Sequence, residues 1–458
     1  MAAEPQTSSQ PVEHGAWQLA RFHEGASRTA IVWRDREHTY AELTERYQRW
    51  LAQFDAAGVS PGDAVAVIGD YSPASITCLL ALIARRCILV PLSRESRDQH
   101  EEFFRIAELD FLVEMDAADK PAFERMNHRR SHPLLEELRK RREPGLVLFS
   151  SGSTGKPKAI LHGLPRILEK FRKPRHCFRT INFLLFDHIG GFNTLFYTLA
   201  NLGTIVVPAD RSVARVCEVV QKHKVELLPT SPSFLNLLLL AEAHKHYDLT
   251  SLKLITYGTE VMPERTLKLA NDAFPGATFQ QTYGLSELGI LRSKSESNQS
   301  LFVKVGGEDY ETKVEDGTLR IRAKSSMLGY LNAPSPFDAE GWFNTGDAVI
   351  QEGEYYRILG RHSEIINVGG QKVYPAEVEK VIAELPDVVD VAVMGEQHLL
   401  MGQIVVATVQ MNDPQPAVEM RRRIAEHCKG RLQPFMVPAK VKVVTDSPVN
   451  YRFKKVRR

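Results

Sequence analysis

The stretch formed by residues 146–162, LVLFSSGSTGKPKAILH, is the most informative in the chain. Its first four residues are apolar and predict a buried strand, and a second apolar run follows the polar middle. Glycines, hydroxyl side chains and lysines fill the middle, and the backbone N–H groups of such a turn bind anions. The spacing excludes the P-loop of nucleotide hydrolases, because only two residues separate the first glycine from Gly155-Lys156. A phosphate-binding turn and a solvated Ser/Gly hairpin turn both fit these residues.

Composition and charge restrict the classes of protein that fit. The chain has 458 residues, 43% apolar and 25% charged, which suits a soluble protein with more than one domain. A net charge of +2 singles out neither nucleic acid nor a membrane surface. The five cysteines include no CxxC pair, which argues against a disulfide framework or a zinc site. Without a secretory signal or a membrane-spanning apolar run, a reducing, cytoplasmic setting is expected.

Strand and helix patterns alternate before Gly289. Helices are expected over residues 39–57, 75–84 and 232–243, the last with Ser231 as its N-cap. Strands are expected over residues 31–33, 64–68, 87–91, 181–186, 204–208, 225–229, 252–257 and 277–282. This alternation predicts an α/β fold with layered subdomains and a largely parallel sheet.

The pattern of expected helices and strands changes twice after Gly289. Residues 301–350 show short alternating strands and turns, which predict a β-rich subdomain. A compact α+β module follows, with a helix opened by Pro375 and strands over residues 388–393, 404–409 and 439–444. We therefore expect a large N-terminal domain, residues 1–360, and a small C-terminal domain, residues 361–458.

Further segments carry polar residues in specific patterns: FDHIGGF (186–192), YGTE (257–260), QQTYGLSE (280–287), GWFNTGD (341–347) and LGRHSEIINVGGQKVYPAEVE (359–379). The chain ends in NYRFKKVRR (450–458). Together with residues 146–162, these segments resemble, in the same order, motifs of the acyl-adenylate-forming enzymes. That family comprises acyl-CoA and aryl-CoA synthetases, adenylation domains of nonribosomal peptide synthesis and luciferases. The resemblance spans nearly the whole chain and implies a stand-alone ligase whose small C-terminal domain is mobile.

The resemblance implies a site for Mg-ATP. The phosphates would be held by the first stretch, through Ser150, Ser151, Gly152, Ser153, Thr154, Gly155, Lys156 and Lys158. Tyr283 would stack on the adenine beside Gly284, and the Ser286 hydroxyl would contact the α-phosphate. Glu287 would bind Mg²⁺, since one carboxylate plus substrate phosphates is a normal ligand set for that ion. The adenine wall would include Gly258, Thr259 and Glu260.

The ribose and the reacting groups are assigned in the same way. Asp347 would accept hydrogen bonds from the ribose hydroxyls, which suits an ionised carboxylate. Arg361 would lie near the ribose, at a hinge within residues 360–364. Lys455 would bridge the substrate carboxylate and the α-phosphate as the catalytic lysine. Lys454 replaces the glycine that the family has at this point, so the assignment to Lys455 rather than Lys454 stays open.

The acyl pocket falls on two segments. The resemblance implies that His188 shapes or gates the pocket, and the lining residues would be Phe186, Asp187, Phe192, Tyr257 and Leu285. Asp187 stands about where amino-acid-activating relatives place the aspartate that pairs with the substrate amine. An aspartate beside a strand end is also a common cap, so both interpretations stay open.

The resemblance implies ATP-dependent activation of a carboxylic acid, with release of pyrophosphate, and transfer of the acyl group to a thiol. Coenzyme A ranks first as the acceptor, and a separate carrier protein or an amine is the alternative. A non-catalytic relative that binds nucleotide without turnover is a second alternative. A basic protein that binds nucleic acid through residues 139–142 and the tail is a third, and nothing else in the sequence favours it. The acid and the oligomeric state, monomer or homodimer, stay open.

Overall fold

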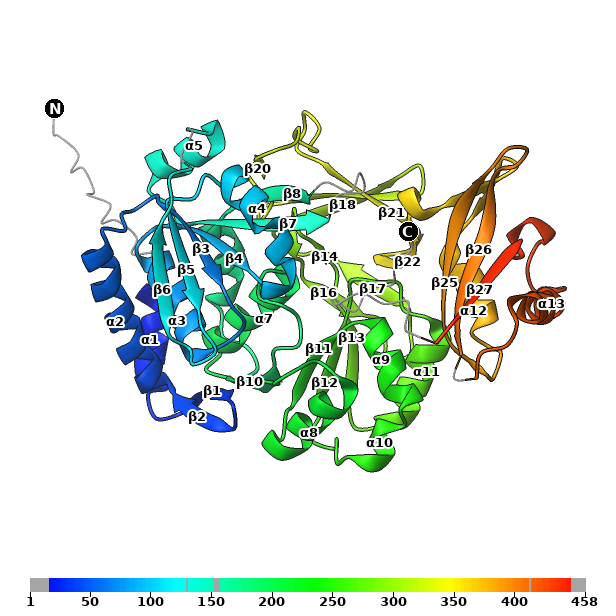
Figure 1. The fold of residues 1–458 in the computed structure, drawn as a ribbon, viewed down its shortest axis with the longest axis horizontal. Helices are drawn as coiled ribbons and strands as arrows, with labels where there is room; N and C mark the ends of the chain where they lie inside the picture. The colour runs from blue at the N-terminus through cyan, green and yellow to red at the C-terminus, as the bar shows by residue number, and fades with distance from the viewer. Residues whose placement is uncertain (1–15, 129–130, 152–156, 412, 446–458) are drawn as a thin grey trace. The chain divides into compact units, whose positions relative to one another are not determined.

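A computed structural model describes residues 16–128, 131–151, 157–411 and 413–445 (Figure 1). The chain divides into two compact units, each built from segments that are not contiguous in sequence. Unit 1 consists of residues 1–178, 186–207 and 326–335, and unit 2 consists of residues 179–185, 208–325 and 336–458.

Unit 1 is built on a sheet in the strand order β20-β8-β7-β4-β3-β5-β6. Its central strands pair in parallel, and β8, β20 and β6 run antiparallel to their neighbours. The strands are β3 (Ala64–Ile68), β4 (Ile88–Leu92), β5 (Phe111–Met115), β6 (Pro121–Arg125), β7 (Gly145–Ser151), β8 (Pro157–Gly163) and β20 (Gly329–Tyr330). The expected strands over residues 64–68 and 87–91 are therefore confirmed to within one residue.

The helices of unit 1 begin where the sequence supplies caps. Ser72 accepts a hydrogen bond from the Ser75 backbone and Pro73 follows, so α3 begins two residues before the expected position. Thr39 caps α2 in the same way. The helices are α1 (Ala16–Glu24), α2 (Tyr40–Ala57), α3 (Pro73–Ala84), α4 (His100–Ile106), α5 (Pro133–Arg141), α6 (Leu164–Leu168) and α7 (Ile189–Ala200). In Figure 1, α2 and α3 pack against one another beside the sheet.

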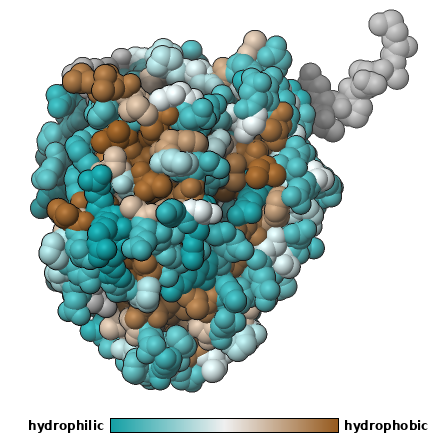
Figure 2. Space-filling view, turned by 90° about the vertical axis from the view of Figure 1, so that its right-hand side faces the viewer, coloured by the Kyte–Doolittle hydropathy of each residue, from teal (hydrophilic) through white to brown (hydrophobic). Residues whose placement is uncertain are grey.

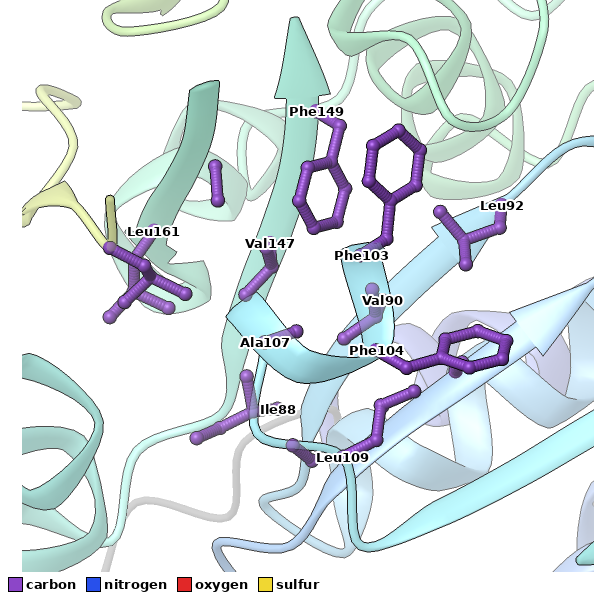
Figure 3. Packing of buried hydrophobic residues seen from close by; sticks show 14 of the residues in the cluster. Ile88, Val90, Leu92, Phe103, Phe104, Ala107, Leu109, Val147, Phe149 and Leu161 are labelled. Carbon is purple, nitrogen blue, oxygen red and sulfur yellow. The ribbon is translucent and has the colours of Figure 1, made fainter. Parts of the chain in front are cut away.

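An apolar core fills one side of this sheet (Figure 3). Phe103 of α4 stacks on Phe149 of β7, with ring centroids 3.9 Å apart and planes 11° apart. Val147 of β7 and Leu161 of β8 belong to the same core. The two strands that flank the predicted phosphate-binding turn are thus anchored in a packed interior. A smaller group of strands completes unit 1: β1 (Thr29–Trp33) pairs with β2 (Arg36–Thr39) and with β10 (Thr204–Val207).

Unit 2 contains four parallel strands in the order β13-β12-β11-β9. They are β9 (Arg179–Ile181), β11 (Leu227–Thr230), β12 (Leu254–Tyr257) and β13 (Thr278–Gln281). The helices between them are α8 (Val213–His223), α9 (Pro232–Leu240), α10 (Ala243–His246) and α11 (Glu264–Ala273). Ser231 caps α9, as expected from the sequence, by accepting a 3.2 Å hydrogen bond from the Phe234 backbone. The largely parallel α/β organisation is confirmed.

One expected strand in unit 2 is wrong. Residues 181–186 were expected to form a strand, but β9 ends at Ile181. The Phe183 backbone N–H bonds to the Ile181 carbonyl at 3.1 Å, a three-residue turn that takes the chain out of the sheet. Phe183 and Phe186 are still buried, and burial alone makes an irregular segment look like a strand in sequence.

The β-rich part of unit 2 follows α11 and β13. A two-stranded hairpin joins β14 (Gly284–Leu285) to β15 (Gly289–Ile290). A sheet in the order β16-β17-β22-β21-β19-β18 then contains β16 (Ser293–Ser295), β17 (Phe302–Val305), β18 (Tyr310–Glu315), β19 (Thr318–Ala323), β21 (Phe343–Glu352) and β22 (Tyr355–Arg361). The expected β-rich subdomain is therefore confirmed.

The C-terminal part of unit 2 is an α+β domain with its own core. Its elements are β23 (Ile366–Val368), β24 (Gln371–Val373), α12 (Pro375–Ile382), β25 (Val388–His398), β26 (Gly402–Met411), α13 (Ala417–Cys428) and β27 (Lys440–Val444). The sheet runs β24-β23-β26-β25, with β27 also paired to β26. Figure 2, seen from the side where Figure 1 draws β25–β27 and α13, shows apolar patches between hydrophilic residues. Exposed large apolar side chains of this domain are Leu399, Leu400, Met401 and Val418.

No helix in the described part of the chain is both long and apolar enough to cross a membrane.

Candidate functional site

The two apolar runs within residues 146–162 form the two strands of a β-hairpin. β7 and β8 pair antiparallel, and Ser150 lies opposite Lys158 in the register. Both residues are half-buried. The side chain of Ser151 and residues Gly152, Ser153, Thr154, Gly155 and Lys156 lie outside the described residues. Of the predicted phosphate ligands, the structure therefore places Ser150 and Lys158, at the base of the turn.

A segment that no sequence motif identified lies beside Lys158. The Lys158 ammonium lies 5.0 Å from the centroid of the Tyr330 ring. The side chain of Asn332 hydrogen-bonds to the backbone of Pro157 and Ala159, on either side of Lys158. These contacts join positions more than 170 residues apart, so no local sequence signal identifies them.

The segment with Tyr283 forms a tight hairpin. Leu285 lies opposite Gly289 in β14–β15, so Ser286 and Glu287 occupy the connecting turn. Gly289 closes the turn with a φ of +79°, a conformation that favours glycine. Gly284 is equally constrained, because an added Cβ would lie 2.7 Å from the Gly289 carbonyl oxygen. The glycines of this motif thus shape a turn that presents a hydroxyl and a carboxylate together.

Tyr283, Asp347 and Arg361 meet in unit 2. The Tyr283 hydroxyl donates a 2.5 Å hydrogen bond to Asp347 Oδ2. Asp347 of β21 lies opposite Arg361 of β22, and Arg361 Nε is 3.4 Å from Asp347 Oδ1. The structure therefore brings together three residues that come from three separate motifs. All three had been predicted to surround the adenosine.

Burial controls the electrostatics of this group. Asp347 is 7% exposed, and burial raises its pKa, while the Arg361 charge and the Tyr283 hydrogen bond act in the opposite direction. Burial, followed by repulsion from Asp347, raises the pKa of Tyr283 well above its usual value. Tyr283 is therefore a neutral hydrogen-bond donor at physiological pH. The exposed Arg361 side chain supplies positive charge at the same place.

The predicted adenine wall follows β12. Gly258 is buried, and a Cβ there would lie 2.6 Å from Thr282 Oγ1 and 2.7 Å from the Thr282 carbonyl oxygen, so only glycine fits. Thr259 has a φ of +71° and is exposed. The Glu260 carboxylate accepts hydrogen bonds from the backbone and hydroxyl of Ser233, at 3.2 and 2.6 Å, in the first turn of α9. This places the carboxylate at a helix N-terminus, and its role toward nucleotide stays a prediction.

The predicted acyl-pocket residues fall in both units. In unit 1, His188 caps α7: its Nδ1 accepts a 3.1 Å hydrogen bond from the Gly190 backbone, which fixes the imidazole ring. Asp187 Oδ2 accepts a 3.2 Å hydrogen bond from the Ser93 backbone, so this carboxylate ties two loops of unit 1 together. Phe186 packs edge-on against Tyr71 with ring centroids 5.9 Å apart.

The other predicted acyl-pocket residues are also buried. Phe192 packs against Phe196 with centroids 4.6 Å apart. Tyr257 and Leu285 belong to unit 2 and are buried there. The pocket role of this whole set stays a prediction, as does that of the residues in the C-terminal segment. Lys454 and Lys455 lie outside the described residues.

Comparisons with known proteins agree over most of the chain. A family model described as "AMP-binding enzyme" matches residues 20–331, and one described as "AMP-binding enzyme C-terminal domain" matches residues 377–454. Indoleacetate–CoA ligase of Aromatoleum aromaticum is 25% identical, over 92% of this chain and 92% of that protein.

Two solved structures share the fold. The anthranilate CoA ligase AuaEII, in complex with anthranoyl-AMP, has a TM-score of 0.81 at 20% identity, covering 98% of this chain and 97% of that one. The amide bond synthetase McbA of Marinactinospora thermotolerans has a TM-score of 0.74 at 20% identity, covering 96% of this chain and 98% of that one. These likenesses agree with the α/β fold and its large N-terminal and smaller C-terminal domains.

Proposed function

The chain belongs to the AMP-binding enzyme family, and we propose that it activates a carboxylic acid with ATP and transfers the acyl group to coenzyme A. The observation that carries the proposal is the contact of Tyr283 and Arg361 with the buried Asp347. The group offers an aromatic ring, a carboxylate that accepts ribose O–H bonds, and a cation. Adenosine phosphates present the matching groups: a flat base, two hydroxyls and negative charge.

The proposed reaction has two steps. A carboxylate oxygen of the acid attacks the α-phosphorus of ATP, a C–O–P linkage forms, and the bond to pyrophosphate breaks. The thiolate of coenzyme A then attacks the acyl carbon, and AMP leaves. Lys455 is the proposed source of positive charge at the α-phosphate, where preorganised charge lowers the barrier most.

The phosphates of ATP are proposed to lie at the β7–β8 turn. Ser150 and Lys158 stand at its base, half-buried and opposite one another. A lysine at this place supplies positive charge, and a serine hydroxyl supplies a hydrogen bond. Both are suited to phosphate oxygens.

A magnesium ion is proposed at Glu287. Among the described residues, no three His, Cys, Asp or Glu side chains lie close enough together to hold a metal by themselves. A single carboxylate at a turn fits a magnesium ion that takes most of its ligands from phosphate oxygens and water. The ion would supply charge neutralisation on the departing pyrophosphate, and Glu287 would orient it.

Coenzyme A is the proposed acceptor because the relative named above is a CoA ligase. A separate carrier protein or an amine remains an alternative acceptor, and one solved structure of the same fold is an amide bond synthetase. The names of the relatives point to aromatic acids as the first substrates to test.

A cytoplasmic setting is part of the proposal. All five cysteines are free, and Cys177 is exposed. Free, exposed thiols persist in reducing compartments, where ATP and coenzyme A are also available.

The test separates the two steps. The protein is incubated with Mg-ATP and each member of a panel of aryl, fatty and amino acids, and acyl-AMP and pyrophosphate are measured. Coenzyme A, a phosphopantetheinyl carrier protein or an amine is then added to the active acid. The proposal predicts acyl-AMP with one class of acid and an acyl thioester with coenzyme A. Bound ATP without acyl-AMP for any acid would contradict it and support a non-catalytic nucleotide-binding relative.

A further inference from the structure

A short segment of unit 1 lies along the strand that carries Lys158. β20 pairs antiparallel with β8, with Tyr330 opposite Ile160. The Leu331 backbone N–H then bonds to the Ala159 carbonyl at 2.9 Å. The backbone pairing stops at the next residue, Asn332, whose side chain instead bonds to the first residues of β8.

The Asn332 side chain continues the strand pairing in place of a backbone. Its Oδ1 accepts a hydrogen bond from the Ala159 N–H at 2.9 Å, and its Nδ2 donates to the Pro157 carbonyl at 2.8 Å. The Pro157 carbonyl and the Ala159 N–H belong to the two peptide groups that flank Lys158. One side-chain amide therefore fixes both peptide planes around a single residue.

Only an amide of this length suits the position. It needs a donor and an acceptor in fixed relation, as in a peptide group. An aspartate would lose the donor toward Pro157, and a leucine of similar size would lose both bonds. The same segment also positions the lysine side chain, because the Lys158 ammonium lies over the Tyr330 ring.

We propose that Asn332 is a positioning residue for Lys158, and that it sets the direction in which this lysine meets the β- and γ-phosphates of ATP. This inference rests on the proposed function. Asn332 is exposed and the fold around β8 is anchored elsewhere, by Leu161 and Val147 in the core. Its two hydrogen bonds consequently add little to global stability, and their effect is local to Lys158.

The first experiment compares two nucleotides. Binding of AMP and of a non-hydrolysable ATP analogue is measured by calorimetry for the wild-type chain and for Asn332→Leu. AMP lacks the phosphates that Lys158 is proposed to hold. We expect affinity for the ATP analogue to fall about 5- to 30-fold, as for the loss of one or two hydrogen bonds, while affinity for AMP stays the same. An equal loss for both nucleotides would overturn the positioning role.

The second experiment asks whether Asn332 acts through Lys158. Asn332→Leu is introduced into a Lys158→Ala background, and affinity for the ATP analogue is measured for all four proteins. We expect almost no further loss in the double variant, because the group that Asn332 positions is absent. Additive losses would contradict the inference.

A matched control exists in unit 2. Asn298 makes the same kind of clamp around Thr278: its Oδ1 accepts from the Phe279 N–H and its Nδ2 donates to the Ala277 carbonyl, both at 3.1 Å. Asn298→Leu should leave the ratio of the two nucleotide affinities unchanged. Thermal denaturation of each variant checks that it is folded. If the wild-type chain binds no ATP analogue, the proposed function itself fails; if it binds and Asn332→Leu binds equally well, only the role of Asn332 fails.

Discussion

Asp347 receives a hydrogen bond from Tyr283 and faces Arg361 across two strands. Tyr283 contacts Oδ2 of the carboxylate and Arg361 contacts Oδ1, and both contacts favour its ionised form. Burial raises the pKa of Asp347 even so, which means that this carboxylate takes up a proton at a higher pH than an exposed aspartate does. A protonated carboxyl group loses an acceptor for the ribose hydroxyls. Because the pKa of Asp347 is raised, we expect this loss of nucleotide binding to begin at a higher pH than for an exposed aspartate.

We expect AMP affinity to fall as the pH is lowered through the raised pKa of Asp347, above the usual range near 4. The folded-state pKa is higher than the unfolded one, so protonation of Asp347 favours the folded state, and this group does not cause unfolding as the pH falls. Asp347→Asn should bind AMP about 10- to 100-fold more weakly at neutral pH and lose this part of the pH dependence. Titration calorimetry from the usual aspartate range near pH 4 up to about pH 8 measures both. The surface variant Asp309→Asn serves as the control, and an unchanged profile in Asp347→Asn would contradict the ribose role.

Asn182 is a buried amide without a side-chain hydrogen bond in the described part of the chain. It is 1% exposed, and neither its amide nitrogen nor its carbonyl oxygen has a hydrogen-bond partner among the described residues. An unpartnered buried amide costs free energy, so Asn182→Leu should leave the free energy of unfolding unchanged or raise it, by about 1 kcal/mol.

Thr204→Val is the matched comparison for this prediction. Its buried hydroxyl donates a 2.7 Å hydrogen bond to the Thr29 carbonyl, and its loss should cost about 1 kcal/mol. Urea denaturation gives both values. A loss of more than about 2 kcal/mol in Asn182→Leu would mean that a bound molecule satisfies the amide in solution.

At the residue scale, sequence motifs predict which side chains form the candidate site, but they do not predict contacts with segments outside the motifs. Tyr283, Asp347 and Arg361 belong to recognisable motifs, and they do meet. The contact of Glu260 with Ser233 and that of Asn332 with β8 join distant segments, and neither leaves a local signal in sequence. The lysine assigned to catalysis, Lys455, stays a prediction because it lies outside the described residues.

At the scale of elements, the core behind the β7–β8 hairpin supports the proposed phosphate site. Phe103→Ala removes the ring that stacks on Phe149 and should lower the free energy of unfolding by about 3–5 kcal/mol, through lost burial and a cavity. Leu269→Ala changes an exposed position on α11 and should cost within about 0.5 kcal/mol. Equal effects in urea denaturation would contradict the packing shown in Figure 3.

Elements with strong local signals were predicted well. Ser231 followed by Pro232 marks the start of α9, and the apolar run of β3 has the observed bounds. The strand expected over residues 181–186 was wrong because a turn over residues 181–183 takes the chain out of the sheet. Phe183 then packs against Phe234 of α9, a contact between distant segments. The strand order within each sheet depends on contacts between distant segments, and sequence patterns do not specify these.

At the scale of the whole molecule, one contact between the C-terminal domain and the rest of unit 2 joins α12 to α11. Lys380 of α12 pairs with Glu264 of α11 at 2.8 Å, and Arg265 donates to the Ala383 carbonyl. Both members of the ion pair are about half exposed, which limits its worth to less than about 1 kcal/mol. The family resemblance implies that the C-terminal domain turns between the two proposed steps. A contact as weak as this one can form and break during such a movement.

Lys380→Ala should therefore change the free energy of unfolding by less than about 1 kcal/mol, yet alter the rate of one proposed step relative to the other by up to about 5-fold. The effect should shrink at high salt, which screens exposed charges. Rates of pyrophosphate release and of thioester formation measure the ratio. Lys304→Ala breaks a similar pair with Glu354 within the β-rich sheet and should not change it. An equal change in both variants would contradict a role for the α11–α12 contact.

The domain boundary expected at residue 360 is a whole-molecule prediction that stays untested. β22 ends at Arg361 and the C-terminal sheet begins at Ile366, so the change of sheet falls near the expected hinge. The two compact units exchange segments along the chain, since residues 326–335 return to unit 1. A boundary placed from local sequence patterns assumes that each domain is one continuous segment, so it misses a segment that returns to an earlier unit.

The central claim is adenylation of a carboxylic acid, and pyrophosphate release is its most direct measure. Wild-type chain, Lys455→Ala and Lys454→Ala are each incubated with Mg-ATP over a panel of aryl, fatty and amino acids. We expect release by the wild type with one class of acid, a loss of about 100-fold or more in Lys455→Ala, and near-normal release in Lys454→Ala. The reverse order of the two variants would move the catalytic role to Lys454. No release with any acid, in a wild-type protein that still binds ATP, would contradict the claim.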